Sequence, residues 1–209
     1  RGQIRAVLSA FEVRAVKTGM LFSKELIETV ADSLDGLDIP LIVDPVMIST
    51  SGSRLLREDA IESLMTRILP RAAVITPNRM EAELLTGMTI RSLRDMESAA
   101  RLCREKFGCG SVIKGGHSES GEEAADVCLF GDELLILRSP RLNLPELTTH
   151  GTGCTFSSAL AAGVAKGLDL PDAARNAKHF VYASLLGHVR TGADLHSMFP
   201  PNLRKGFAD

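Results

Sequence analysis

The segment TTHGTGCTFSSALAAGVAKG, residues 148–167, joins a glycine-containing loop to a run of helix-forming residues, with one cysteine at the junction. The first turn of a helix has backbone N–H groups without intrahelical partners and carries a partial positive charge. Glycine has no Cβ, so a phosphate can approach those N–H groups closely. Gly151, Thr152 and Gly153 are therefore predicted to form an anion-binding loop ahead of a helix over 152–167. A loop that only turns the chain fits the spacing equally well, and the Gly-Lys-Ser/Thr ending of a Walker A loop is absent.

Cys154 allows two interpretations. A helix N-terminus should lower the pKa of a thiol, which would make Cys154 a thiolate nucleophile or base. His150 and His117 are the histidines that could assist it. The alternative is a small buried residue on the helix face, a common place for cysteine. The residues alone leave both interpretations open.

Segments typical of strands and of helices alternate along the chain. Short apolar runs bounded by Gly or Pro predict strands, and capped segments with apolar residues at helical spacing predict helices. The expected strands are 12–21, 39–47, 72–78 and 110–116, then a hairpin of 125–130 and 133–140; the expected helices are 23–36, 57–70, 79–87, 92–108, 152–167 and 171–190. The alternation predicts an α/β fold with a central, mostly parallel sheet flanked by helices on both faces. No linker divides residues 1–209, so we expect a single domain.

Polar or glycine-containing residues follow each of the first four expected strands. In an open α/β sheet, ligands bind beyond the carboxyl ends of the strands. The four exits are Lys17-Thr18-Gly19, Asp44-Pro45, Thr76-Pro77-Asn78 and Lys114-Gly115-Gly116-His117. Together they predict one ligand-binding rim. The Ser/Gly-rich segment 48–56 could close over a ligand there or be only a loop.

Asn78 and Glu81 lie three residues apart in the first turn of an expected helix, so their side chains share one face. They could organise Mg²⁺ through water and orient phosphate, because Mg²⁺ prefers oxygen ligands and keeps several waters. A capping box made by the same two residues is the alternative that the local pattern favours. Lys114 could neutralise phosphate charge or be a solvated strand end. Asp44 could bind a ligand or be a turn residue before a proline.

The composition argues against several classes of function. The 209-residue chain has a net charge of −2, no Trp and one Tyr, which does not favour a nucleic-acid-binding surface. No apolar run reaches the roughly 18 residues that a membrane helix needs, and the first residues lack the apolar core of a signal peptide. The four cysteines form neither a CxxC pair nor a zinc pattern, so we expect reduced thiols in a cytoplasmic protein.

Five motifs occur in the order and approximate spacing of the ribokinase-like superfamily: KTGML, VDPVM, TPNRMEAELLTG, VIKGGH and THGTGCTFSSALAAG. Over about residues 12–185 the chain resembles most closely the hydroxymethylpyrimidine/phosphomethylpyrimidine kinases of thiamine biosynthesis. The cysteine of GTGC is the discriminating residue, because sugar kinases of the superfamily usually carry aspartate there. The fold implied is again a mostly parallel sheet flanked by helices.

The resemblance implies a role for each matched position of the GTGC loop and the first strand exit. Gly151, Thr152 and Gly153 would form the anion hole for the transferring phosphoryl group. Cys154 would occupy the place of the general base, next to the hydroxymethyl group of the substrate. Gly19 and Met20 match the segment that lines the pyrimidine pocket.

The remaining matched positions concern ATP and Mg²⁺. Asn78 and Glu81 match the NxxE motif that organises magnesium and phosphate, with Glu81 on the metal side. Asp44 resembles an acidic residue near the metal and the phosphates, and Lys114 resembles the lysine that contacts the ATP phosphates. Thr76 precedes the NxxE motif at the same strand exit and is grouped with the nucleotide-binding residues.

The two ends of the chain depart from the family pattern. The family begins with a strand and a GTDPSGGAG-like substrate segment, followed by a glutamine that contacts the pyrimidine, and residues 1–209 contain no match to these. The unmatched part is at least one βαβ unit, roughly 30 residues, which we expect to precede residue 1 in the full protein. The C-terminal stretch GHVRTGADLHSMFPPN is also unlike the family's ending, and no role is assigned to it.

The sequence therefore predicts an ATP- and Mg²⁺-dependent kinase that phosphorylates 4-amino-5-hydroxymethyl-2-methylpyrimidine and then its monophosphate. We expect a small-molecule substrate, a homodimer, and no nucleic-acid or membrane partner. Pyridoxal kinase activity is the nearest alternative, since pyridoxal carries a hydroxymethyl group on a similar flat ring. A non-catalytic pyrimidine-binding or regulatory relative is a second alternative. A cysteine hydrolase using Cys154 and His150 is a third, which the lack of an evident orienting carboxylate disfavours.

Overall fold

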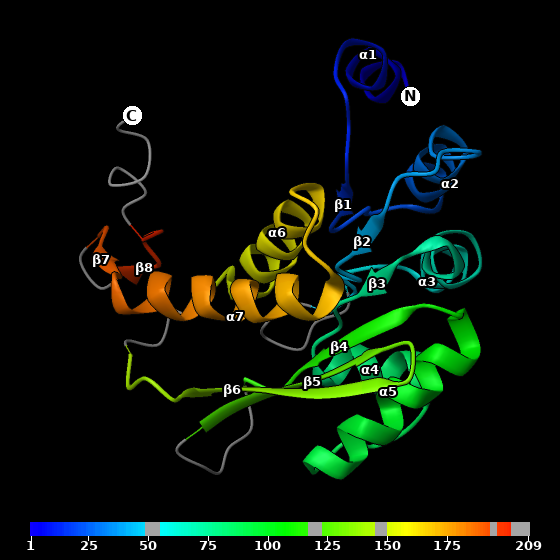
Figure 1. Cartoon of the computed structure of the whole chain (residues 1–209). Helices are drawn as coiled ribbons and strands as arrows, with labels where there is room; N and C mark the ends of the chain where they lie inside the picture. Colours follow the sequence, from blue (N-terminus) through cyan, green and yellow to red (C-terminus); the bar gives the residue numbers. More distant parts are fainter. Residues whose placement is uncertain (49–54, 117–122, 145–149, 193–195, 202–209) are drawn as a thin grey trace.

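A six-stranded sheet forms the centre of the computed structural model, which describes residues 1–48, 55–116, 123–144, 150–192 and 196–201 (Figure 1). Its strands are β1 (Val16–Thr18), β2 (Leu41–Val43), β3 (Val74–Ile75), β4 (Gly110–Lys114), β5 (Glu123–Phe130) and β6 (Glu133–Pro140). They lie side by side in chain order. β1 to β4 are parallel, whereas β5 and β6 form an antiparallel hairpin. The predicted α/β class and the mostly parallel sheet are confirmed.

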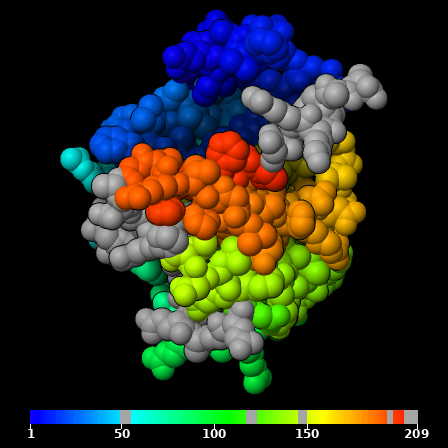
Figure 2. All heavy atoms as spheres, turned by 90° about the vertical axis from the view of Figure 1, so that its left-hand side faces the viewer, coloured from blue at the N-terminus to red at the C-terminus, as the bar shows by residue number. Residues whose placement is uncertain are grey.

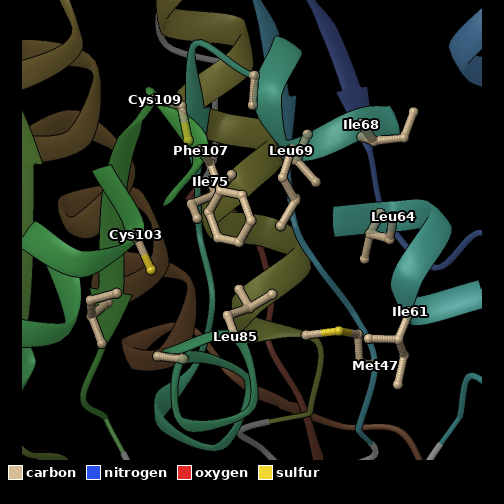
Figure 3. Packing of buried hydrophobic residues seen from close by; sticks show 14 of the residues in the cluster. Met47, Ile61, Leu64, Ile68, Leu69, Ile75, Leu85, Cys103, Phe107 and Cys109 are labelled. Atoms are coloured by element: carbon tan, nitrogen blue, oxygen red, sulfur yellow. The ribbon is translucent and has the colours of Figure 1, made fainter. Parts of the chain in front are cut away.

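Side chains alternate between the two buried faces of the sheet. Leu41, Val43 and Ile75 point into one apolar cluster, and Ile42 and Val74 point into a second. The first cluster is covered by α2 (Lys24–Ser33), α3 (Glu58–Ser63), α4 (Arg79–Thr86) and α5 (Leu93–Phe107). Figure 3 shows part of this cluster around Ile75, Leu85 and Phe107. The second is covered by α6 (Thr152–Ala165) and α7 (Leu170–Leu186), which explains the continuous apolar runs of the strands.

Local capping residues begin and end most of the helices. Ser23, Ser92 and Asp169 each accept a hydrogen bond from a backbone N–H in the first turn of α2, α5 and α7. Gly87 and Gly108 end α4 and α5 in the left-handed conformation that glycine adopts at little cost. Five of the six predicted helices are present with bounds that differ by a few residues, and α6 among them begins without a side-chain cap.

The segment predicted as one helix over 57–70 is irregular. After α3, residues Leu64–Ile68 form a π-helical turn and Leu69–Arg71 form a 3-10 turn. Pro70 therefore lies inside the 3-10 turn and does not end an α-helix. Proline lacks an N–H and its ring crowds the carbonyl four residues earlier, so the backbone widens ahead of it.

Two elements were not predicted. α1 (Gly2–Ala10) has no buried residue and lies away from the sheet, at the top of Figures 1 and 2. A small antiparallel pair, β7 (Val189–Arg190) and β8 (His196–Ser197), follows α7, which runs across the face seen in Figure 2. None of the helices in the described residues is long and apolar enough to cross a membrane. None of the four cysteines forms a disulfide in the structure.

Candidate active site

The carboxyl ends of β2, β3 and β4 meet at one buried carboxylate. Asp44, which is 1% exposed, follows β2. Its Oδ1 accepts hydrogen bonds from Lys114 Nζ at 2.9 Å and from Thr76 Oγ1 at 3.3 Å. Its Oδ2 accepts one from Ser157 Oγ at 3.3 Å. The structure thus brings together three predicted site residues, Asp44, Thr76 and Lys114, as parallel strand ends require.

Ser157 is a site residue that the sequence analysis missed. It lies on α6 one turn after Cys154, and its single hydroxyl proton is shared between Asp44 Oδ2 and the Cys154 carbonyl, which lies 3.0 Å from Oγ. Its side chain is fully buried. The bond to Asp44 fixes the start of α6 against the strand ends. Its position one helical turn after Cys154 was the available signal, since residues three apart share a helix face.

The N-terminus of α6 differs from those of the capped helices. Gly151 is its N-cap, with φ +83°, no side-chain cap and no acidic residue in the first turn. A Cβ added to Gly153 would lie 2.8 Å from Lys114 Nζ, so the ammonium group lies directly against this turn. A cation beside the positive end of a helix concentrates positive potential, which suits an anion. The anion-binding role of residues 151–153 stays a prediction.

Cys154 does not have the lowered pKa that its place at a helix end predicted. Burial raises the pKa of the thiol, and the nearby charge of Asp44 raises it further, while Lys17 and Lys114 lower it. The local pattern could not reveal Asp44, which comes from a distant strand. Of the two histidines considered as assistants, His150 is exposed and His117 lies outside the described residues.

Asn78 and Glu81 form the capping box that the sequence left as the favoured alternative. Asn78 Oδ1 accepts the Glu81 N–H at 2.9 Å, and Glu81 Oε2 accepts the Asn78 N–H at 2.8 Å. Glu81 Oε1 also accepts the Met47 N–H at 3.4 Å. Glu81 is only 2% exposed, and burial raises its pKa to about 7. A capping role and a ligand-binding role are compatible, because the box fixes the carboxylate at the rim.

The donor chemistry at the rim fits Mg²⁺. Asp44 raises the pKa of Glu81 by its charge, so the two carboxylates are near neighbours. In the described part of the chain, no group of three or more His, Cys, Asp or Glu side chains is arranged to hold a metal. Mg²⁺ typically binds one or two carboxylates and keeps waters and substrate phosphates as its other ligands. Asp44 and Glu81 are therefore the residues that would hold it, directly or through water.

The exit of β1 adds a second lysine to the site. Lys17 Nζ lies 3.1 Å from the position of a Cβ added to Gly19, and its charge acts on Cys154. Lys17 was named in the sequence only as part of a polar strand exit. Met20, predicted with Gly19 to line the acceptor pocket, is 51% exposed. In the segment 48–56, residues 49–54 lie outside the described residues.

The C-terminal segment also reaches this site. Met198 Cε lies 3.6 Å from the position of a Cβ added to Gly151, so the residue after β8 contacts the N-cap of α6. The Phe199 N–H donates to the Ser184 carbonyl of α7 at 3.0 Å. No sequence motif predicted this contact, because the tail is unlike the family's ending.

The fold and this rim define a small-molecule kinase of the ribokinase-like class. An ADP complex of Bacillus subtilis pyridoxal kinase superposes with a TM-score of 0.87 at 32% identity, covering 97% of this chain and 76% of that one. A Clostridium difficile phosphomethylpyrimidine kinase superposes with a TM-score of 0.75 at 33% identity, covering 87% and 73%.

The sequence comparisons identify the family. A profile described as phosphomethylpyrimidine kinase matches residues 1–199. The hydroxymethylpyrimidine/phosphomethylpyrimidine kinase of Streptomyces coelicolor is 45% identical over 195 residues, which are 93% of this chain and 71% of the relative. The Synechococcus elongatus protein of the same name is 42% identical, covering 91% and 72%. The chain belongs to the phosphomethylpyrimidine kinase family.

Proposed function

We propose that the protein transfers the γ-phosphoryl group of ATP to the hydroxymethyl group of 4-amino-5-hydroxymethyl-2-methylpyrimidine, and then phosphorylates the resulting monophosphate to the diphosphate. The observation that carries the proposal is the placement of Lys114 Nζ between Asp44 and the first turn of α6. A relative from Arabidopsis thaliana, 42% identical over 181 residues, is named a thiamine biosynthetic bifunctional enzyme. Relatives with bound ADP or AMP-PCP support ATP as the donor.

Charge stabilisation is the main task of the chain in this reaction. Phosphoryl transfer needs alignment and neutralisation of the moving PO₃ group more than covalent help. The backbone N–H groups of Gly151, Thr152 and Gly153 would face that group, and Lys114 would balance the charge of the donor phosphates. Mg²⁺, held by Asp44 and Glu81, would supply further charge neutralisation when it is bound.

Cys154 would contact the acceptor hydroxyl. In the ligand-free protein its pKa lies above the ordinary thiol value, so the thiol keeps its proton at neutral pH. This state favours a role in orienting the hydroxyl group over a role as a preformed thiolate base. In a loose transition state the hydroxyl proton can leave late, so a strong base is not required.

A coupled assay of ADP formation tests the proposal. We expect the wild-type protein with ATP and Mg²⁺ to turn over the hydroxymethylpyrimidine and its monophosphate, with a mass of one added phosphoryl group per step. Pyridoxal is the second acceptor to test, because the solved structures with high TM-scores include pyridoxal kinases from Bacillus subtilis and Staphylococcus aureus. Faster turnover of pyridoxal would replace the pyrimidine proposal. Calorimetric binding of the pyrimidine without ADP formation would support a non-catalytic relative.

Three further features are part of the proposal. Residues 1–209 would belong to one ribokinase-like domain and lack the family's N-terminal strands. The protein would be cytoplasmic, and it would form a homodimer with no nucleic-acid or membrane partner. Light scattering coupled to size-exclusion chromatography tests the oligomeric state. A mass of a single copy, near 22.5 kDa for this chain, would contradict the dimer.

A further inference from the structure

Lys114 faces a carboxylate with which it does not pair. Lys114 on β4 and Asp126 on β5 are direct partners in the antiparallel register. Their neighbours Val112 and Cys128 point into the cluster under α6 and α7, so both charged side chains lie on that face. Cβ atoms of opposed residues lie about 4.5–5.5 Å apart, well within the reach of a lysine. An ion pair across the strands would be the simplest arrangement.

The structure pairs these two residues with different partners. Lys114 Nζ lies 2.9 Å from Asp44 Oδ1, toward the candidate active site. Asp126 Oδ2 lies 2.8 Å from Lys178 Nζ of α7, and Asp126 Oδ1 accepts the Gly115 N–H at 2.9 Å. The Asp126 and Lys178 side chains are 6% and 13% exposed. Both oxygens of this buried carboxylate are therefore occupied without Lys114.

We propose that Lys178 is a positioning residue that directs Lys114 to the donor phosphates by neutralising Asp126. The proposal rests on the proposed function, in which Lys114 contacts ATP. A buried carboxylate without a partner is strongly unfavourable. Without Lys178, Asp126 would draw the ammonium group of its cross-strand partner Lys114 away from Asp44 and the first turn of α6.

The hydrogen bond from the Gly115 N–H to Asp126 Oδ1 also links Asp126 to the backbone next to Lys114. Gly115 directly follows Lys114, and a Cβ at this position would lie 2.2 Å from the Ala125 carbonyl oxygen, so the strand end is tightly packed against β5. Asp126 therefore holds the backbone of the strand end while Lys178 holds the charge of Asp126. The Lys178–Asp126 ion pair therefore affects where the Lys114 backbone lies and which carboxylate Lys114 pairs with. Lys178 is on α7, a helix that contains no predicted site residue.

Calorimetric affinity for Mg²⁺·AMP-PCP and KM for ATP are the readouts that test the proposal. We expect Lys178→Met to weaken both at least tenfold. Asp126→Asn should stay within about threefold of wild type, because a neutral amide does not compete for Lys114 and its oxygen still accepts the Gly115 N–H. In the double variant Lys178→Met/Asp126→Asn, the affinity for Mg²⁺·AMP-PCP and KM for ATP should also stay within about threefold of wild type. Lys178→Arg should also remain near wild type.

If the Lys178–Asp126 ion pair only stabilises the fold, the nucleotide affinity of the double variant should be at least as impaired as that of Lys178→Met. That result, or unchanged affinity in Lys178→Met, would overturn the proposal, and so would a tenfold loss in Asp126→Asn alone. Arg175→Met is the matched control, since it removes a cation from the same helix that pairs with Asp172 at the surface. If Lys178→Met does not fold, Asp126→Asn and the double variant Lys178→Met/Asp126→Asn still test the proposal. If wild type binds Mg²⁺·AMP-PCP but phosphorylates only another acceptor, the substrate proposal fails and this one stands.

Discussion

The pKa of Cys154 depends on residues that are distant from it in the sequence. Its sequence neighbours place it at a helix end, which alone would lower the pKa. Burial of the thiol and, after it, the charge of Asp44 raise the pKa instead. The Ser157 bond that brings α6 to Asp44 joins residues 113 positions apart. Motifs pointed to Asp44, Thr76 and Lys114 but not to Ser157, and the electrostatics of these residues depend on contacts between strands and helices that no local pattern contains.

Substitutions of Cys154 distinguish orientation of the acceptor from base catalysis. A serine keeps a group that can hydrogen-bond to the acceptor hydroxyl, whereas alanine keeps none. If orientation dominates, kcat of Cys154→Ser should stay within about tenfold of wild type while Cys154→Ala loses about 10²-fold or more. Steady-state ADP formation measures both. Equal losses in the two variants would favour a thiolate base instead, and near-full turnover in Cys154→Ala would remove the residue from catalysis.

Glu81 should make stability depend on pH. Its pKa rises from 4.5 to about 7 on folding, because the carboxyl is buried. Between these values the folded protein binds a proton that the unfolded chain releases, so the free energy of unfolding falls as pH rises through that window. Relative to Glu81→Gln, wild type should lose up to about 3 kcal/mol between pH 4.5 and 8. Urea unfolding in Mg²⁺-free buffer measures this, and parallel pH profiles of the two proteins would contradict it.

Helices were predicted more reliably than strands, and the reason is physical. The helix caps at Ser23, Asn78, Ser92 and Asp169 act on neighbouring residues and can be recognised in the sequence. Strand length depends on pairing with other strands, so the strand and turn predicted within 12–21 contain a strand of only three residues, Val16–Thr18. The π turn before Pro70 and the unpacked α1 lacked a sequence signature that the capping rules could detect.

Two glycines of α6 have different tasks within one helix. In Gly153→Ala the new Cβ would displace the Lys114 ammonium group, so we expect KM for ATP to rise about tenfold with little change in stability. In Gly163→Ala the new Cβ would lie 3.0 Å from Ala173 Cβ of α7, which should lower the free energy of unfolding by about 1 kcal/mol and leave KM unchanged. Kinetics and urea unfolding of both variants measure this contrast. A shared effect on KM would contradict it.

Across the whole molecule, stability should be unevenly distributed. α1 has no buried residue, and an isolated helix of its length is marginal in water. The strands β2 and β3 consist of residues that are at most 5% exposed. Amide hydrogen exchange followed by mass spectrometry should therefore show protection in residues 2–10 about 10³-fold or more below that of residues 41–43 and 74–75. Comparable protection in both regions would mean that α1 is held by contacts that the structure does not contain.

The agreement between strand order and chain order has a consequence for synthesis on the ribosome. Each strand from β2 to β6 can pair with the one made just before it, so the sheet can assemble as the polypeptide emerges. Its second face, with Ile42, Val74 and Val112, stays bare until α6 and α7 are translated. Residues 151–153 belong to that last layer. In the proposed function a nascent chain could therefore bind nucleotide only after α6 has been made, and until then chaperones would meet an uncovered apolar face of the sheet.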